Sequence, residues 1–293
     1  MSRDRPSQLA PDSFRASGDR VSRPAIPFAE TEYGIVKRLV VVERWMRRIE
    51  ESLGQSPLSV LDYGCGTGDH LTYPLALTGH DVLGVDIHEL SIVEGRRRYA
   101  LPNLAFRSGT VDDLLAEGLT FDAAICSEVL EHLHDPRDFL VKLRRLVRAG
   151  GAAIITTPNG YGSFEMLRRL EAILNRVGVH QALRRFVAAG RALGRRVRGS
   201  EASPCSGFLD YHSVHVQFFR LKRLESLFRQ SGFQVVERRA RTLLCGPYID
   251  VAFRLVPWRQ PIFRLNNRLA DLLPFAWAAD WMFLLEQTGD VRG

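Results

Sequence analysis

The sequence predicts an α/β fold in which helices cover both faces of a parallel sheet. Two observations predict it: the chain contains apolar runs of strand length, and these runs alternate with helical patterns. The five runs are Ser59–Tyr63, Asp81–Ile87, Leu104–Arg107, Phe121–Ser127 and Ala152–Thr157. Helices are expected between them at about His70–Leu77, Leu90–Tyr99 and Pro136–Arg148, and Gly150–Gly151 is expected to cap the last helix.

The regular alternation stops after the fifth run. Residues 1–30 form a polar arm that is expected to be disordered, and a helix follows over Gly34–Leu53, where apolar residues recur at steps of three and four. We therefore predict one domain over residues 31–293 with two insertions, a basic helical one at about 162–210 and an irregular one at about 243–278. The remaining elements are expected to be a helix at Leu221–Gln230 and strands at Phe233–Arg239 and Asp280–Glu286.

Composition limits the class of protein. With 45% hydrophobic and 25% charged residues, the chain is neither disordered nor collagen-like. None of the four cysteines lies in a C-x-x-C pair, which disfavours a zinc site and favours reduced thiols in a cytoplasmic protein. The N-terminal arm lacks the apolar stretch of a signal peptide, and no apolar run reaches the length of about 18 residues that crosses a membrane. A cytoplasmic location is therefore expected.

A glycine-rich turn, Gly64–Gly68, follows the first predicted strand. Glycines let a backbone turn sharply and approach a ligand, and the helix that follows favours an anionic group at its N-terminus. Asp86 ends the second predicted strand, where a carboxylate can accept both hydroxyls of a ribose. A nicotinamide dinucleotide is disfavoured, because its G-x-G-x-x-G pattern has glycine where this loop has Asp69. The acids that flank the loop, Asp62 and Asp69, instead suit a ligand that carries an ammonium group.

Three motifs carry a family resemblance. The run Val60-Leu61-Asp62-Tyr63-Gly64-Cys65-Gly66-Thr67-Gly68 resembles motif I of class I S-adenosylmethionine (SAM)-dependent methyltransferases. Gly84–Ile87 resembles motif II, and Phe121–His132 resembles motif IV with the helix after it. Within this class the chain is most similar to the ubiquinone-biosynthesis O-methyltransferase-like group, which carries a similar E-x-x-E-H after the fourth strand. The resemblance covers about Glu32–Pro158 and resumes at His215–Arg239. It implies a Rossmann-like, seven-stranded, mostly parallel sheet whose last strand is antiparallel.

The resemblance also implies how SAM would be bound. Asp62 and the glycine loop would line its methionine end, Asp86 would hold the ribose, and Ile87 would flank the adenine. The adenine-edge motif is usually Gly-Asp-Ala after the third strand; here Thr110 replaces the acid, and Asp112 is the nearby alternative. The full set of predicted SAM-binding residues is Asp62, Gly64, Cys65, Gly66, Gly68, Asp86, Ile87, Thr110, Val111, Asp112 and Ser127.

Candidate catalytic residues follow the fourth predicted strand, at the carboxyl edge where open α/β sheets bind ligands. The spacing of Glu128, Glu131 and His132 would place them on one face of a helix. Three interpretations stay open. His132 is a general base oriented by a carboxylate, or all three side chains ligate a hard divalent ion such as Mg²⁺, or the acids only stabilise a helix N-terminus. His215 matches a histidine that many of these enzymes carry before their last large helix, and Asn159 follows the fifth strand; both are further candidates for the acceptor pocket.

The excess positive charge is confined to one segment. The segment from Phe164 to Ser200 contains nine arginines and two glutamates, an excess that equals the whole net charge of +7. Apolar residues recur among the arginines at helical spacing, as in amphipathic helices at membrane surfaces. Three alternatives stay open: a lid with a solvated arginine face, contact of 164–200 with an anionic membrane surface on its cytoplasmic side, and contact with nucleic acid. Nucleic acid is disfavoured because few aromatic residues interleave the arginines.

These observations together predict SAM-dependent methyl transfer, most simply to an oxygen of a small-molecule acceptor. A lipid-linked, quinone-like or cell-envelope glycan intermediate is expected, because the basic segment and the apolar residues near the C-terminus suit a greasy, membrane-associated acceptor. One alternative is a nucleic-acid methyltransferase, although the chain lacks an N-P-P-Y-like motif after the fourth strand. Another is a non-catalytic SAM-binding protein at a membrane, which would not need the cluster of Glu128, Glu131 and His132.

Overall fold

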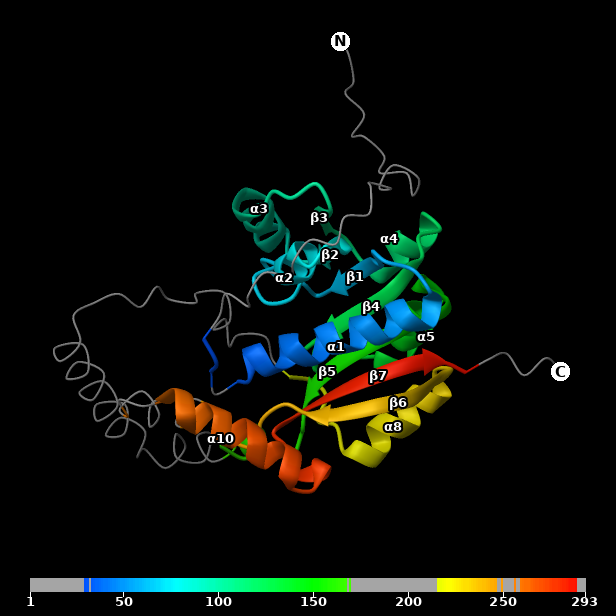
Figure 1. The fold of residues 1–293 in the computed structure, drawn as a ribbon. Coiled ribbons are helices and arrows are strands. Elements are labelled where there is room, and N and C mark those ends of the chain that lie inside the picture. The colour runs from blue at the N-terminus through cyan, green and yellow to red at the C-terminus, as the bar shows by residue number, and fades with distance from the viewer. Residues whose placement is uncertain are drawn as a thin grey trace, which may run out of the picture.

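A computed structural model describes residues 29–31, 33–167, 169, 215–246, 249, 256 and 259–288. In these parts of the chain one seven-stranded sheet has helices on both faces (Figure 1). Its strands are β1 (Ser59–Tyr63), β2 (Asp81–Asp86), β3 (Leu104–Ser108), β4 (Phe121–Ser127), β5 (Val147–Pro158), β6 (Phe233–Ala240) and β7 (Asp280–Gln287). The helices are α1 (Ile35–Leu53), α2 (Thr72–Leu77), α3 (Glu89–Arg98), α4 (Val111–Ala116), α5 (Pro136–Leu146), α8 (Leu221–Gln230) and α10 (Arg259–Leu272), with 3₁₀ turns η2 (Leu130–His132) and η3 (Phe275–Trp277).

The strand order is β3-β2-β1-β4-β5-β7-β6. Strands β1 to β5 pair in parallel, and β7 pairs antiparallel with both β5 and β6. This confirms the predicted Rossmann-like sheet with its antiparallel last strand. Because β1 lies between β2 and β4, the strand order reverses at β1, and open α/β sheets bind ligands at the carboxyl ends of the strands beside such a reversal.

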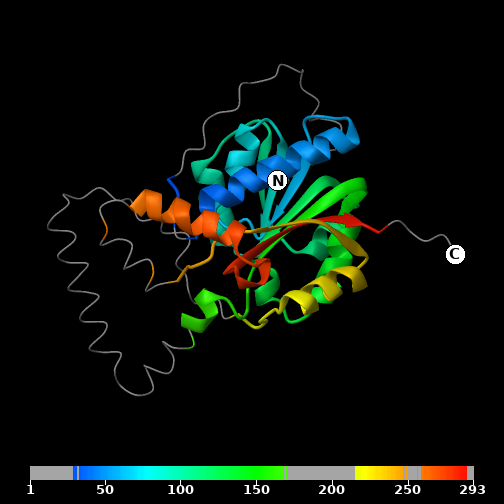
Figure 2. The same cartoon turned by 60° about the horizontal axis from the view of Figure 1, so that its bottom comes forward.

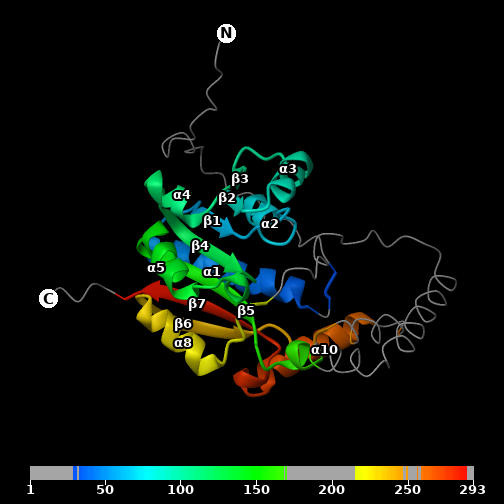
Figure 3. The same cartoon turned by 180° about the vertical axis from the view of Figure 1, so that it is seen from behind.

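The central strands are buried on both faces, which explains why they are apolar at nearly every position. Val60 belongs to the core that includes residues of α1 and α2, whereas the next residue, Leu61, belongs to the core that includes residues of α4, α5 and α8. Trp45 of α1 and Phe228 of α8 are fully buried in these two cores. Figure 1 shows α1 across the near face of the sheet, and Figure 3 shows α5 across the opposite face.

The helix after β4 ends earlier than predicted. Helix α5 stops at Leu146, and Gly150–Gly151 lie inside β5 rather than at a helix cap. Val147 already pairs with Phe121, and the register between β4 and β5 then shifts before Ala152. Gly151 allows this irregular pairing, because a Cβ there would lie 2.4 Å from the carbonyl oxygen of Asp122.

The second predicted insertion is not irregular throughout, because it contains helix α10. Pro261 lies in the first turn of the helix, where no backbone N–H is needed. The helix buries Phe263, Asn266, Asn267 and Ala270 at helical spacing. Two of these four are asparagines, which hid the pattern from a search for apolar residues. The backbone carbonyl of Asn267 accepts a hydrogen bond from Lys37 Nζ at 2.8 Å. Helix α10 therefore contacts the start of α1, and Figure 2 shows the two helices (orange and blue) side by side.

Two predicted features fall mainly outside the described residues. These are the N-terminal arm, 1–30, and the basic segment, 164–200, of which only 164–167 and 169 are described. The insertion boundaries at 162–210 and 243–278 stay predictions. Among the helices of the described ranges, none is both long and apolar enough to span a bilayer.

Candidate active site

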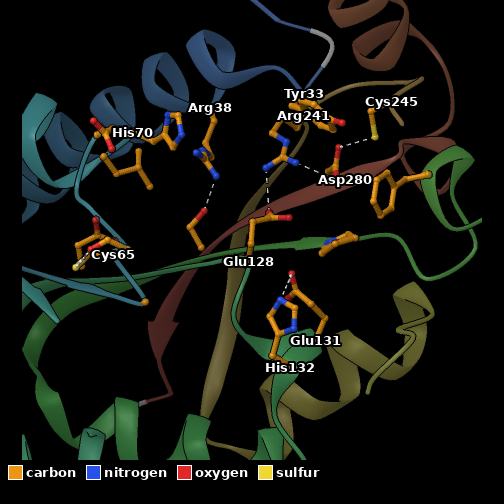
Figure 4. Close-up of a pocket in the computed structure, with 18 of the residues that line it drawn as sticks. Tyr33, Arg38, Cys65, His70, Glu128, Glu131, His132, Arg241, Cys245 and Asp280 are labelled. Atoms are coloured by element: carbon orange, nitrogen blue, oxygen red, sulfur yellow. Dashed lines mark hydrogen bonds and ion pairs between the residues drawn. The ribbon is translucent and has the colours of Figure 1, made fainter. Parts of the chain in front are cut away.

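A cavity of about 310 Å³ lies at the carboxyl ends of β1 and β4, where the strand order reverses (Figure 4). The glycine loop after β1 forms one wall, and the residues after β4 form another. Arg38 from α1, Arg241 after β6, Asp280 of β7 and His215 before α8 complete the lining. The cavity therefore joins segments from both ends of the described chain.

The glycine loop is shaped by neighbouring side chains and by the space in front of it. Gly64, Gly66 and Gly68 all have positive φ, between 56° and 83°. A Cβ on Gly64 would lie 2.3 Å from a methyl carbon of Val129, and one on Gly68 would lie 2.5 Å from the Phe106 ring. A Cβ on Gly66 would meet no atom within 4 Å, and Gly66 lines the cavity. Gly66 is therefore the point where a ligand can approach the backbone most closely.

Two carboxylates accompany the loop. Asp62 is buried in the cavity wall and accepts a hydrogen bond from Thr72 Oγ1 at 2.6 Å. Burial raises the pKa of Asp62 to about 6, although Thr72 and Arg38 oppose the shift. Asp86, at the end of β2, accepts hydrogen bonds from the backbone N–H groups of Gly66 and His88, both at 2.8 Å. Asp86 therefore holds the loop in the conformation that opens the cavity.

The cavity brings together five of the predicted SAM-binding residues: Asp62, Gly64, Cys65, Gly66 and Ser127. The other six, Gly68, Asp86, Ile87, Thr110, Val111 and Asp112, lie outside its lining. Ile87 is 74% exposed, Thr110 caps α4 in a reciprocal pair with Asp113, and Asp112 pairs with Lys142 at 3.0 Å. Their assignment to the ribose and adenine stays a prediction.

The predicted helix through Glu128, Glu131 and His132 is wrong. Glu128 has φ +59°, so the chain turns sharply after β4, and only the short η2 follows. The turn separates the three side chains into two groups (Figure 4). Glu128 accepts hydrogen bonds from Arg241 Nη1 at 3.0 Å and Thr156 Oγ1 at 2.7 Å, whereas Glu131 lies beside His132.

The first group is a buried ion network that the sequence analysis missed. Arg241 bridges Glu128 and Asp280, with Nη–O distances of 3.0 Å to each. Arg38 donates a hydrogen bond from Nη1 to Ser127 Oγ at 2.8 Å. Burial, and then the nearby Arg241, lower the pKa of Arg38 to about 10, so the guanidinium remains charged near neutral pH. Although burial opposes it, Arg241 and then Arg38 lower the pKa of Glu128.

The second group consists of Glu131, His132 and His215. One ligand atom from each residue lies within 4.8 Å of the others. His132 Nε2 is 3.9 Å from Glu131 Oε1, and the rings of His132 and His215 meet edge to face, with centroids 4.9 Å apart. Burial, and then Glu128, raise the pKa of Glu131 well above its usual value. A group of this kind can move a proton or hold a divalent cation, and His215 takes the place that Glu128 was expected to fill.

A family model described as a methyltransferase domain matches residues 38–238, more than half of the chain. The chain belongs to this methyltransferase family. The ubiquinone biosynthesis O-methyltransferase of Mesorhizobium japonicum is 33% identical over 153 residues, which cover 51% of this chain and 58% of that protein. The corresponding protein of Roseobacter denitrificans is 38% identical over 104 residues, covering 35% and 42%. The chain spans about half the length of the curated relatives it matches.

A solved structure shares the fold of this methyltransferase. It is a putative sarcosine dimethylglycine methyltransferase from Galdieria sulphuraria, with a TM-score of 0.51 and 14% sequence identity, and the match covers 86% of each chain. At this identity the likeness concerns the fold alone.

Asn159 has a structural place in the methyltransferase rather than the predicted one in the acceptor pocket. It is buried, and its Nδ2 donates hydrogen bonds to the carbonyls of Ala276 and Ala278 at 2.9 and 2.8 Å. Its Oδ1 accepts a hydrogen bond from the backbone of Tyr161. These contacts use the amide to fix the chain around η3, and Asn159 is not among the residues that line the cavity.

Among the cavity residues that were not predicted from the sequence are two arginines. Arg38 lies within the apolar pattern of α1, and Arg241 follows β6 directly. An arginine in an otherwise apolar helix face is a signal that could have been used, because a buried guanidinium needs acceptors nearby.

Proposed function

We propose that this methyltransferase transfers the methyl group of SAM to a hydroxyl oxygen of a small acceptor. The observation that carries the proposal is the cavity itself, which joins an open glycine loop to the group of Glu131, His132 and His215. Positioning of the two reactants in line supplies most of the catalysis for such a displacement, and a base that accepts the hydroxyl proton supplies the rest.

The residues of the loop wall fit SAM. Gly66 leaves room for a ligand against the backbone, and Asp62 supplies a carboxylate for an ammonium group. Arg38 is fully buried, and its Nε has no hydrogen-bond partner among the described residues, which suits it to a carboxylate. When bound, SAM would supply an electrophilic methyl group on a sulfonium. Cys65 is not a suitable nucleophile for that methyl, because burial raises the pKa of its thiol.

Proton acceptance by a histidine is the mechanism we favour. As the oxygen–methyl bond forms and the sulfur–methyl bond breaks, the hydroxyl proton passes to an imidazole nitrogen of the cavity, and S-adenosylhomocysteine leaves. His132 and His215 both line the cavity, whereas Glu128 is engaged by Arg241. The second candidate is a divalent cation on Glu131, His132 and His215, supported by the spacing of their ligand atoms.

We propose a quinone-like, lipid-linked acceptor, with the cell-envelope glycan as the alternative. The relatives from Mesorhizobium japonicum and Roseobacter denitrificans carry the name ubiquinone biosynthesis O-methyltransferase. In this chain, Leu265, Leu269 and Leu272 are exposed along α10, with Leu272 81% exposed, and Trp277 follows them. Leu244, which hydrogen bonds Asn266 of α10, precedes Cys245 of the cavity wall. An apolar surface of this kind, together with the basic segment 164–200, suits contact with an anionic membrane.

The test is transfer of a labelled methyl group from SAM to a hydroquinone with a polyprenyl tail. The acceptor is presented in phosphatidylglycerol vesicles or in phosphatidylcholine vesicles, and organic and aqueous phases are then separated. We expect label in the organic phase, faster from the anionic vesicles, and resistant to chelation by EDTA if a histidine acts alone. Two variants are compared: Asp86→Asn removes a charge of the predicted SAM site, and Glu225→Gln removes one from the partly exposed surface of α8, away from the cavity lining.

Each outcome separates the alternatives. Label that is confined to the aqueous phase with a host extract would favour a glycan or nucleic acid over a lipid-linked acceptor. SAM binding with no transfer to any acceptor would favour the non-catalytic SAM-binding protein. Loss of transfer in EDTA, restored by Mg²⁺, would favour the metal over the histidine base.

A further inference from the structure

A buried carboxylate, Glu165, lies within hydrogen-bond distance of one ring nitrogen of His215. Glu165 Oε1 lies 2.7 Å from His215 Nδ1, and Glu165 is 1% exposed. His215 lines the cavity, whereas Glu165 does not. The pair therefore combines a histidine of the cavity lining with a buried carboxylate outside that lining.

Both partners are fixed by the surrounding chain. Glu165 lies in a helical turn at residues 163–167, and Ser163 Oγ of that turn donates to the carbonyl of Leu243 and accepts from the N–H of Cys245. Next to His215, the N–H groups of Val216 and Gln217 both donate to the carbonyl of Glu131, at 2.8 and 3.0 Å. The backbone next to His215 is therefore anchored to Glu131, and the turn that carries Glu165 is anchored to the segment after β6.

We propose that Glu165 is a positioning residue that keeps the proton of neutral His215 on Nδ1 and presents the lone pair of Nε2 to the cavity. The reason is that a carboxylate accepts but does not donate, so the ring nitrogen that faces it must carry the hydrogen. The proposal rests on the proposed function, because the lone pair matters only if the acceptor reacts at this end of the cavity. There the hydroxyl proton passes to Nε2 as the oxygen–methyl bond forms and the sulfur–methyl bond breaks.

The tautomer of His215 can be measured without an acceptor. Long-range ¹H–¹⁵N spectra of protein labelled in its eight histidines report which ring nitrogen carries the hydrogen. Spectra are recorded at about pH 8.5, where neutral imidazoles dominate, and His215→Gln identifies the signal. We expect an Nδ1–H tautomer in the unaltered protein. We expect Glu165→Gln to shift the population towards Nε2–H, because an amide can donate to Nδ1, while Glu225→Gln leaves it unchanged.

Kinetics then separate positioning from a merely structural contact. Glu165→Gln is expected to lower kcat about ten- to a hundredfold, the usual effect of losing such a supporting carboxylate, with the Kd for SAM unchanged by calorimetry. Glu165→Asp, which keeps the acceptor, should recover part of kcat and the Nδ1–H signal. An Nε2–H tautomer in the unaltered protein, or a tautomer that Glu165→Gln does not shift, would overturn the proposal. Absence of methyl transfer by the unaltered protein would instead refute the proposed function and leave the tautomer result standing.

Discussion

The two ends of the cavity are built differently. The end at the glycine loop comes from one contiguous stretch, Asp62 to Leu71, held by Asp86 at the end of the adjacent strand. The opposite end is assembled from Glu131, His132 and His215, supported by Glu165. A contiguous stretch can be recognised from its spacing alone, whereas the other end depends on which distant segments the fold brings together. The two ends should therefore also respond differently to substitution, the first in SAM affinity and the second in turnover.

The largest expected effect is on turnover. His132→Ala removes an imidazole from the cavity lining, where Figure 4 shows His132 beside Glu131 and below Glu128. We expect kcat to fall by about 10² to 10⁴, the range that a positioned acid or base contributes, while the Kd for SAM changes little. Steady-state kinetics and calorimetry measure the two quantities. The matched control is His134→Ala, an exposed histidine outside the cavity lining, which should leave both unchanged.

Equal losses of SAM affinity and turnover in His132→Ala would contradict the division of the cavity into two ends. Unchanged turnover would remove His132 from the proposed mechanism and leave His215 as the candidate histidine of the cavity.

Much of the fold and half of the site were predictable, for a physical reason. β1, β2, β4 and α8 are buried or amphipathic segments whose period is visible locally, and their predicted bounds agree with the structure to within a residue or so. Helix α10 was missed because buried asparagines interrupt its apolar pattern. The sharp turn at Glu128 was missed because a glutamate with positive φ has no local signature; tertiary contacts to Arg241 and Thr156 hold it there.

Glu165 illustrates the limit of local patterns most clearly. In the sequence it is one of two acids among nine arginines, and nothing in its spacing relates it to His215, fifty positions later. Only the folded structure brings the turn that follows β5 within hydrogen-bond distance of that ring. Arg38 and Arg241 were missed for a related reason, since Arg38 hydrogen bonds Ser127, 89 positions away, and Arg241 hydrogen bonds Glu128, 113 positions away.

The next largest effect compares two glycines of the loop. In Gly68→Ala the new methyl group would clash with the Phe106 ring, and the alanine would also have to adopt a positive φ. In Gly66→Ala the methyl group meets no atom within 4 Å, so only the strain of a positive φ remains. We expect the free energy of unfolding to fall by about 2–4 kcal/mol in Gly68→Ala and about 1 kcal/mol in Gly66→Ala. SAM affinity should show the reverse order once Gly68→Ala is measured in its folded state, because the space in front of Gly66 is cavity. Urea unfolding and SAM titration check both; a larger loss of stability in Gly66→Ala would contradict the packing argument.

The smallest effect is a pH dependence at the loop end. Burial raises the pKa of Asp62 to about 6, so its carboxyl is mostly neutral at pH 5 and mostly ionised at pH 7. If Asp62 pairs with an ammonium group, SAM affinity should fall about tenfold between pH 7 and pH 5. His70, whose pKa burial and Arg38 lower to about 4, stays neutral through this range and does not compete. In Asp62→Asn the affinity should be lower at pH 7 and nearly flat with pH.

The raised pKa of Asp62 makes the stability of the ligand-free protein depend on pH in the opposite direction to SAM affinity. Because the folded state holds the proton of Asp62 more tightly than the unfolded chain does, this group stabilises the fold below pH 4, and the contribution is lost as the pH rises to about 6. Saturating SAM should remove that loss, since an ammonium group beside Asp62 would stabilise its ionised form. Thermal unfolding at pH 4.5 and 7, with and without SAM, compares the two dependences against Asp62→Asn. If SAM affinity rises on acidification in the unaltered protein, the ammonium group does not lie beside Asp62. The orientation assigned to SAM in the cavity would then be wrong.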